Sequence, residues 1–134
     1  MSFGAVLDQG IRLDCISTDL TVQAREATVF SMTELMSRYF GFGFTLPEII
    51  AMSTTNPAAA LGIADRSGRL EVGRRADISV LDVRSGNWVV RDFFEVELRL
   101  STVIVPALTV LAGELYSPDW GPHPWGWEPE RATV

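Results

Sequence analysis

Few side chains in this sequence are of the types that carry out catalysis or bind metal ions. The chain has one histidine, His123, one cysteine, Cys15, and no lysine. A thiol and an imidazole can act together as nucleophile and base. A cysteine on a strand is more often a small buried hydrophobic residue, and we expect that role for Cys15. Asp19 is the other candidate, although an aspartate after a predicted strand most often caps the following turn or helix.

The number of available ligands argues against a metal site within this chain. A catalytic zinc ion takes three protein ligands, mostly His, Asp, Glu or Cys, and keeps one position for water. Cys15 precedes Asp19 by four residues, a separation of roughly 13 Å along an extended chain. A single carboxylate does not hold a divalent ion against water. We therefore expect the isolated chain to bind no metal and no other cofactor.

The elements that would position Asp19 follow from hydrophobic periodicity. Residues 11–17 alternate as a strand does, and residues 24–40 carry the apolar stripe of a helix. Thr45-Leu46-Pro47-Glu48 has the pattern of a capping box, which predicts a second helix beginning there. A helix next to a strand is typical of an α/β unit.

The stretch of residues 56–82, NPAAALGIADRSGRLEVGRRADISVLD, predicts a short helix, a tight hairpin and a strand. Asn56 is expected to be the N-cap, with Pro57 as the first helical residue. Gly68 and Gly73 bracket a predicted short strand at 69–72. Asp77 is expected to accept hydrogen bonds from backbone amides of its turn.

The remaining chain reads as β-structure followed by an irregular arm. Strands are predicted at 77–83, 87–92 and 103–112, with a further candidate at 94–100 and a turn at Ser85-Gly86-Asn87. Residues 103–112 are apolar on both faces, which predicts a central, covered strand, and Pro106 predicts a bulge or an edge. The Pro/Trp-rich end, 117–134, is predicted to be an extended arm pinned by its tryptophans.

Composition excludes several classes of protein. The formal net charge is −6 and the sequence pI is about 4.7, whereas binding to nucleic acid needs a basic surface. One cysteine excludes an internal disulfide and fits a reducing compartment. No apolar run approaches the ~20 residues of a membrane span. We therefore expect a cytoplasmic protein that binds neither nucleic acid nor membrane.

Two motifs in this order carry a family resemblance: N-P-A-x-x-L-G, then G-x-L-x-x-G-x-x-A-D-x-x-x-L-D. They resemble the C-terminal segment of the metal-dependent amidohydrolase superfamily, in its dihydroorotase-like and deacetylase-like branch, over residues 2–116. Residues 16–20, ISTDL, resemble the end of the family's eighth barrel strand. The resemblance implies that Asp19 is a metal ligand and general base for zinc or another divalent metal in a complete parent site. It implies a hydrolase of C–N bonds in amides, cyclic amides or N-acyl amino acids.

The expected fold class is mixed α+β. We expect residues 1–64 to be a remnant of the last β/α barrel unit, 65–116 to form an antiparallel β-sandwich-like domain, and 117–134 to be the arm. At 134 residues the chain is shorter than the ~250 of a whole barrel, and it lacks the family's His-x-His motif.

Two functional hypotheses follow. The first is a fragment or truncated relative of such a hydrolase, inactive as the isolated chain. The alternative is a non-enzymatic oligomeric binding or interaction module derived from that fold. Unpaired strand edges predict a homo-oligomer, such as a strand- or arm-swapped dimer.

Overall fold

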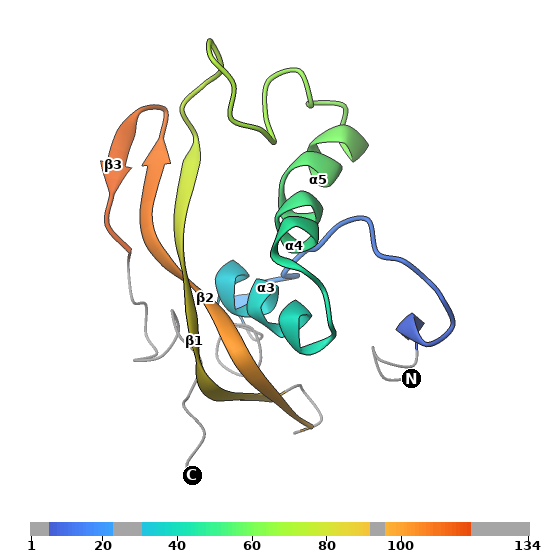
Figure 1. Cartoon of the computed structure of the whole chain (residues 1–134). Coiled ribbons are helices and arrows are strands. Elements are labelled where there is room, and N and C mark those ends of the chain that lie inside the picture. The colour runs from blue at the N-terminus through green and yellow to red at the C-terminus, as the bar shows by residue number, and fades with distance from the viewer. Residues whose placement is uncertain (1–5, 23–30, 92–95, 119–134) are drawn as a thin grey trace.

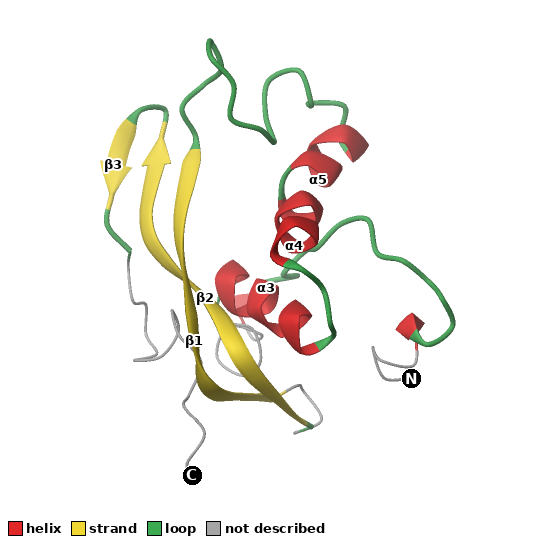
Figure 2. Cartoon of the chain, viewed as in Figure 1, coloured by secondary structure: helices red, strands yellow, loops and turns green. Residues whose placement is uncertain are grey.

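The computed structural model describes residues 6–22, 31–91 and 96–118. Within these ranges the chain is a mixed helical and antiparallel β-structure, which confirms the coarse fold class. None of the helices described is both long enough and apolar enough to cross a membrane. The main elements are α3 (Met32–Gly41), α4 (Leu46–Ser53), α5 (Thr55–Ala60), β1 (Ile78–Arg91), β2 (Glu97–Leu111) and β3 (Glu114–Tyr116). The helices lie on one side of a long, curved β1–β2 ribbon (Figures 1 and 2).

Helix α3 begins later than the periodicity predicts. Ser31 has an extended backbone, with φ −158° and ψ 163°, and its Oγ accepts the N–H of Glu34 at 3.0 Å. This N-cap interrupts the single helix predicted over 24–40, of which residues 24–30 lie outside the described ranges. Ser31-x-x-Glu34 is itself a helix-start pattern, so the signal was present in the sequence.

Helix α4 begins where its capping box predicts. The Thr45 N–H donates to Glu48 Oε2 at 2.8 Å, and the Thr45 hydroxyl donates to the same oxygen at 2.6 Å. These bonds are local, because both partners belong to the first turn of α4 and its N-cap. The buried face of the helix, Ile49 and Met52, then packs into the core.

Strand β1 merges the two strands predicted at 77–83 and 87–92. The turn predicted at Ser85-Gly86-Asn87 is wrong, because the β1–β2 pairing continues past it with a register shift between Ser85 and Trp88. A Cβ on Gly86 would lie 2.5 Å from the Trp88 ring, so the glycine leaves room for the indole. The residues therefore form a bulge that seats a buried tryptophan.

Strand β2 is central, as predicted, in the sheet order β1-β2-β3. Val103, Ile104 and Val105 are at most 1% exposed although successive residues point to opposite faces, so both faces are covered there. A register shift opposite Pro106, between Val80 and Leu81, is the predicted bulge. β2 also takes in most of the candidate strand at 94–100, whereas β3 was not predicted.

The strand predicted at 69–72 is wrong. This stretch is a loop in which the Val72 side chain is fully exposed. Arg74 organises the loop, since its guanidinium donates to the Ala64 carbonyl at 2.8 Å and to Glu71 at 2.6 Å. Two glycines around four residues therefore mark a closed loop here and not a hairpin.

Asp77 has a structural role, but with a different partner from the one expected. Its Oδ1 accepts the N–H of Ala112 at 2.8 Å, and the Gly113 N–H donates to the Ala76 carbonyl at 3.0 Å. The carboxylate thus ties the start of β1 to the hairpin between β2 and β3.

The buried apolar residues form two clusters. One joins α3 and α4 to the sheet and contains Ile16, Met36, Ile49, Met52 and Ile104. The other contains Trp88, Val90, Leu100, Val103 and Val105. Ile16 belongs to the first cluster, so the stretch that leads to Asp19 is anchored in the core.

Candidate functional site

The stretch before Asp19 is not the strand that its alternation predicts. Residues 11–21 form neither helix nor strand, and in the described ranges no strand pairs with them. Alternation along one segment gives a strand only when a neighbouring strand supplies hydrogen bonds. The prediction of a strand at 11–17 is therefore wrong for this structure.

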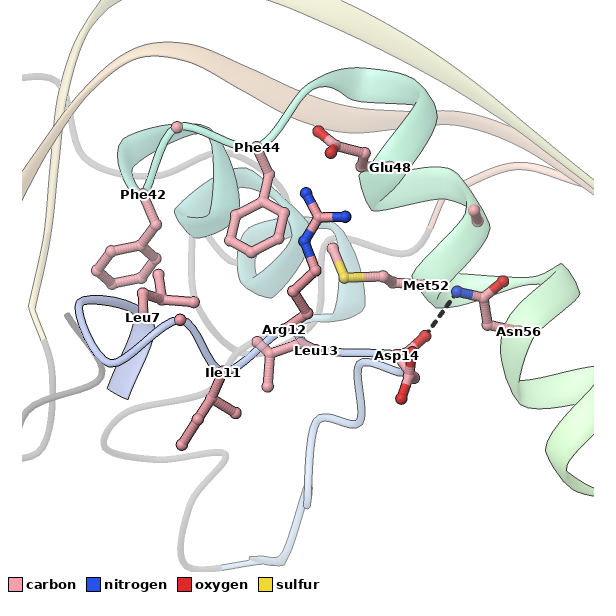
Figure 3. Close-up of a pocket in the computed structure, with 13 residues that line it drawn as sticks. Leu7, Ile11, Arg12, Leu13, Asp14, Phe42, Phe44, Glu48, Met52 and Asn56 are labelled. Atoms are coloured by element: carbon pink, nitrogen blue, oxygen red, sulfur yellow. Dashed lines mark hydrogen bonds between the residues drawn. The ribbon is translucent and has the colours of Figure 1, made fainter. Parts of the chain in front are cut away.

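Two hydrogen bonds hold this stretch against the helices. The Ile16 N–H donates to the Met52 carbonyl at 2.9 Å, and Asn56 Nδ2 donates to the Asp14 carbonyl at 2.8 Å (Figure 3). The prediction that Asn56 caps a helix is wrong, because α5 already begins at Thr55. Its side chain instead makes a contact 42 residues away in sequence.

Asp19 is exposed and has an unusual backbone. Its φ is +47°, and Ala112 is the other non-glycine residue with positive φ in the described part of the chain. Aspartate tolerates this left-handed conformation better than most residues. Ala112 lies in the two-residue β2–β3 turn, which explains its conformation, whereas no such turn surrounds Asp19.

The structure does not bring a set of metal ligands together around Asp19. Among the residues described, no group of three or more His, Cys, Asp or Glu side chains could hold an ion. Cys15 is exposed, so the expectation that it is buried is wrong. His123 and the tail tryptophans lie outside the described residues. The described residues therefore do not fit a metal centre of their own.

A groove of about 460 Å³ lies beside the stretch before Asp19 (Figure 3). Sequence reasoning missed it, because its walls come from segments that are far apart in the chain. Those walls are residues 7 and 10–14, the α3–α4 connection at 42–44, residues 48, 51 and 52 of α4, and Asn56.

The groove combines aromatic and charged groups. Phe42, Phe44 and Met52 supply apolar surface, and the Arg12 guanidinium points toward the Glu48 carboxylate (Figure 3). The Thr45 hydroxyl and amide lower the pKa of Glu48, and the positive charge of Arg12 lowers it further. Glu48 therefore stays anionic at neutral pH while it caps α4.

The Glu48 cap predicts a pH-dependent contribution to stability. A carboxyl group whose pKa is lowered by folding stabilises the fold above its unfolded pKa, and the contribution is lost as pH falls through the folded pKa. We expect Glu48→Gln to lower the urea midpoint at about pH 6 and to have less effect at about pH 3. Thr45→Ala should reduce the pH dependence in the same way. Parallel pH profiles for Glu48→Gln and the unsubstituted chain would contradict this role.

The chain is similar to known proteins over most of its length. The model of the amidohydrolase family matches residues 1–113. A deacetylase from Enterococcus faecalis is 27% identical over 111 residues, which are 82% of this chain and 30% of that protein.

Two solved structures have the same fold over this region. An adenine deaminase matches with a TM-score of 0.79 and 26% identity, over 86% of this chain and 31% of that chain. A dihydroorotase matches with a TM-score of 0.76 and 26% identity, over 85% and 30%. The chain thus spans just under a third of the length of these proteins. Because the family model covers most of its length, the chain belongs to the amidohydrolase family.

Proposed function

We propose that this chain forms part of a metal-dependent hydrolase of C–N bonds and supplies Asp19 to its metal site. The supporting observation is the family match over residues 1–113, which includes the ISTDL stretch that ends in Asp19 and Leu20. Amides, cyclic amides and N-acyl amino acids are the substrate classes that the resemblance implies. The similarity to a deacetylase supports the N-acyl class among these.

In this proposal the other metal ligands come from polypeptide outside these 134 residues. The described residues offer no three-ligand group, and Asp19 is exposed with a left-handed backbone. Conformations of that kind are often kept at functional sites, where surrounding structure determines them. The isolated chain should therefore be inactive.

The same proposal accounts for the architecture. Residues 11–19 with α3, α4 and α5 correspond to the end of a β/α barrel, and the β1–β2–β3 sheet is one part of a β-sandwich. The division between the two parts lies near residue 64. In this proposal the remaining barrel and sandwich strands would come from polypeptide that corresponds to the part of the adenine deaminase structure that this chain does not match; the match covers 31% of that structure.

Metal analysis of the isolated chain is the first test. We expect less than about 0.1 zinc per chain after dialysis against micromolar Zn²⁺, because one carboxylate does not retain the ion. We also expect no hydrolysis of N-acetyl amino acids. A stoichiometric ion together with turnover by this chain alone would overturn the proposal.

A chimera tests the role of Asp19 directly. Residues 1–113 of this chain would replace the matched segment of the Enterococcus faecalis deacetylase. Asp19→Asn should then lower kcat by roughly a hundredfold or more, the size of effect expected for a group that takes part in proton transfer. Asp14→Asn is the matched control, since Asp14 is exposed on the same stretch. If Asp19→Asn is as active as Asp14→Asn and the unsubstituted chimera, the proposed role of Asp19 is excluded.

A further inference from the structure

We infer that Asn56 is a positioning residue for Asp19. Its side-chain amide and the Met52 carbonyl form a clamp that holds residues 14–16 on the junction between α4 and α5, and this clamp determines where Asp19 lies. The inference rests on the proposed function, because it explains how the fold holds the carboxylate that this function uses. Asn56 acts through Asp19 and not on the substrate.

The break between α4 and α5 supplies both bonding groups of the clamp. Thr54, with φ −134° and ψ −81°, departs from helical geometry and separates the two helices. Met52 therefore lies in the last turn of α4, where carbonyls have no N–H partner within their own helix. Its carbonyl accepts the Ile16 N–H at 2.9 Å. Asn56 lies in the first turn of α5, and its Nδ2 donates to the Asp14 carbonyl at 2.8 Å (Figure 3).

The two bonds restrain the stretch more firmly than one bond would. They lie on either side of Cys15, so a shift of the backbone along its own direction breaks both. Ile16 is also 6% exposed and belongs to the core cluster that joins α3 and α4 to the sheet. Within the described ranges, Asn56 is the residue outside this stretch whose side chain forms a hydrogen bond with residues 11–19. The helices therefore hold the stretch through one replaceable side chain.

A short connection separates the clamp from Asp19. Ser17 and Thr18 follow the buried Ile16, and Thr18 Oγ1 accepts the Leu20 N–H at 3.3 Å, a bond that spans Asp19. Bonds of this kind between a side chain and a nearby backbone group stabilise turns. The Asp19 backbone, with φ +47°, thus lies between a clamped segment and a local turn. A displacement of the clamped segment is passed to the carboxylate.

Hydrogen exchange in the full chain tests the clamp. We expect Asn56→Ala to quicken exchange at the Ile16 amide roughly tenfold, because loss of one bond lets its neighbour open more often. The Ile49 amide, which donates to the Thr45 carbonyl at 3.0 Å at the start of α4, should keep its rate. Unchanged exchange at Ile16 would overturn the inference. Equal acceleration at both amides would mean a general loosening of the helices and would also overturn it.

The activity of the deacetylase chimera tests the effect on Asp19. Asn56→Ala should lower kcat roughly tenfold and keep KM within about twofold, because a displaced proton acceptor slows the chemical step more than it weakens substrate binding. Ser53→Ala is the matched control, since its hydroxyl donates within α4, to the Ile49 carbonyl at 2.7 Å. It should leave both constants unchanged. An Asn56→Ala chimera with the kcat of Ser53→Ala would contradict the positioning role.

Asn56→Asp separates positioning from helix stability. Aspartate has the shape of asparagine but, when ionised, has no hydrogen to donate to the Asp14 carbonyl. A carboxylate in the first turn of a helix is favourable, so this change should not weaken α5. We expect the same loss of kcat as in Asn56→Ala. Full activity of Asn56→Asp would trace the effect to the stability of α5 and exclude the positioning role.

The two sets of variants separate this inference from the proposed function. Loss of activity in Asp19→Asn, with full activity in both Asn56 variants, contradicts the positioning role alone. Full activity in Asp19→Asn contradicts the proposed function, whatever the Asn56 variants do. The Asp14→Asn control keeps the clamp, because Asp14 contributes its backbone carbonyl.

Discussion

Replacing Gly68 by alanine is expected to lower the free energy of unfolding by about 3 kcal/mol. The Gly68 φ is +90°, where a side chain costs ~1–2 kcal/mol. A Cβ there would also lie 2.6 Å from Ala58 Cβ and 2.9 Å from the Thr54 carbonyl oxygen. Neither atom is at the end of a flexible side chain, so the backbone of α5 or of the loop has to shift. Overpacking of this kind costs ~1–3 kcal/mol.

Gly73→Ala is the matched control. Gly73 has nearly the same φ, +87°, but no atom lies within 4 Å of the place where its Cβ would be. We expect a loss of about 1 kcal/mol from backbone conformation alone. Urea denaturation of the two variants at one pH measures the difference. Equal losses would mean that the contact of Gly68 with α5 contributes nothing.

Ser37→Ala should lower the free energy of unfolding by about 2 kcal/mol. Ser37 and Ile104 are both completely buried. The Ile104 N–H donates to Ser37 Oγ at 2.8 Å, and the Ser37 hydroxyl donates to the Thr33 carbonyl at 2.6 Å. β3 pairs with residues 109–111 only, so none of the strands in the described ranges lies beside Ile104 on that side. Alanine would leave a buried N–H without an acceptor, which costs ~1–3 kcal/mol.

Ser53→Ala is the matched control for Ser37→Ala, because it removes a serine hydroxyl that accepts no buried N–H. The Ser53 hydroxyl donates to the Ile49 carbonyl at 2.7 Å within α4 and is partly buried. Its removal leaves no buried N–H unpaired, and we expect a loss below about 1 kcal/mol. Hydrogen exchange at the Ile104 amide should quicken in Ser37→Ala only. Unchanged exchange there would contradict the role of Ser37.

Local signals in the sequence predicted the elements that depend on local contacts. The start of α4 at the Thr45–Glu48 capping box is an example, because all its hydrogen bonds lie within one turn. The end of the helical stripe near Gly41 was likewise correct. The Ser31-x-x-Glu34 helix-start pattern is an equally local signal for the start of α3. The apolar stripe over residues 24–40 instead favours a single longer helix.

Features that depend on residues far apart in the chain could not be predicted from local sequence patterns. Asn56 has the residue type of an N-cap, yet it bonds to Asp14, which no local pattern reveals. Gly86 has the residue type of a turn, yet the Trp88 ring needs its space. Residues 11–17 alternate correctly, but no strand of the described chain pairs with them.

In the candidate site too, local features could be predicted from the sequence, whereas features that depend on distant residues could not. The motif around Asp19 placed the residue within a family, and the family match over residues 1–113 confirmed that relationship. Its exposure and its left-handed backbone are features of the folded structure that the motif does not predict. The groove could not be predicted from the sequence, because Arg12, Phe44 and Glu48 come together only when α3 and α4 pack.

The contact between Ser37 and Ile104 also bears on solubility. A sheet with an uncovered side can add strands from neighbouring molecules without limit, and fibrils grow in that way. At Ile104 the outer side of β2 is occupied by a helix, whose hydroxyl takes the place of a further strand. Helix α3 therefore blocks the edge of β2 at Ile104, and a strand from another molecule cannot pair with the sheet at this position.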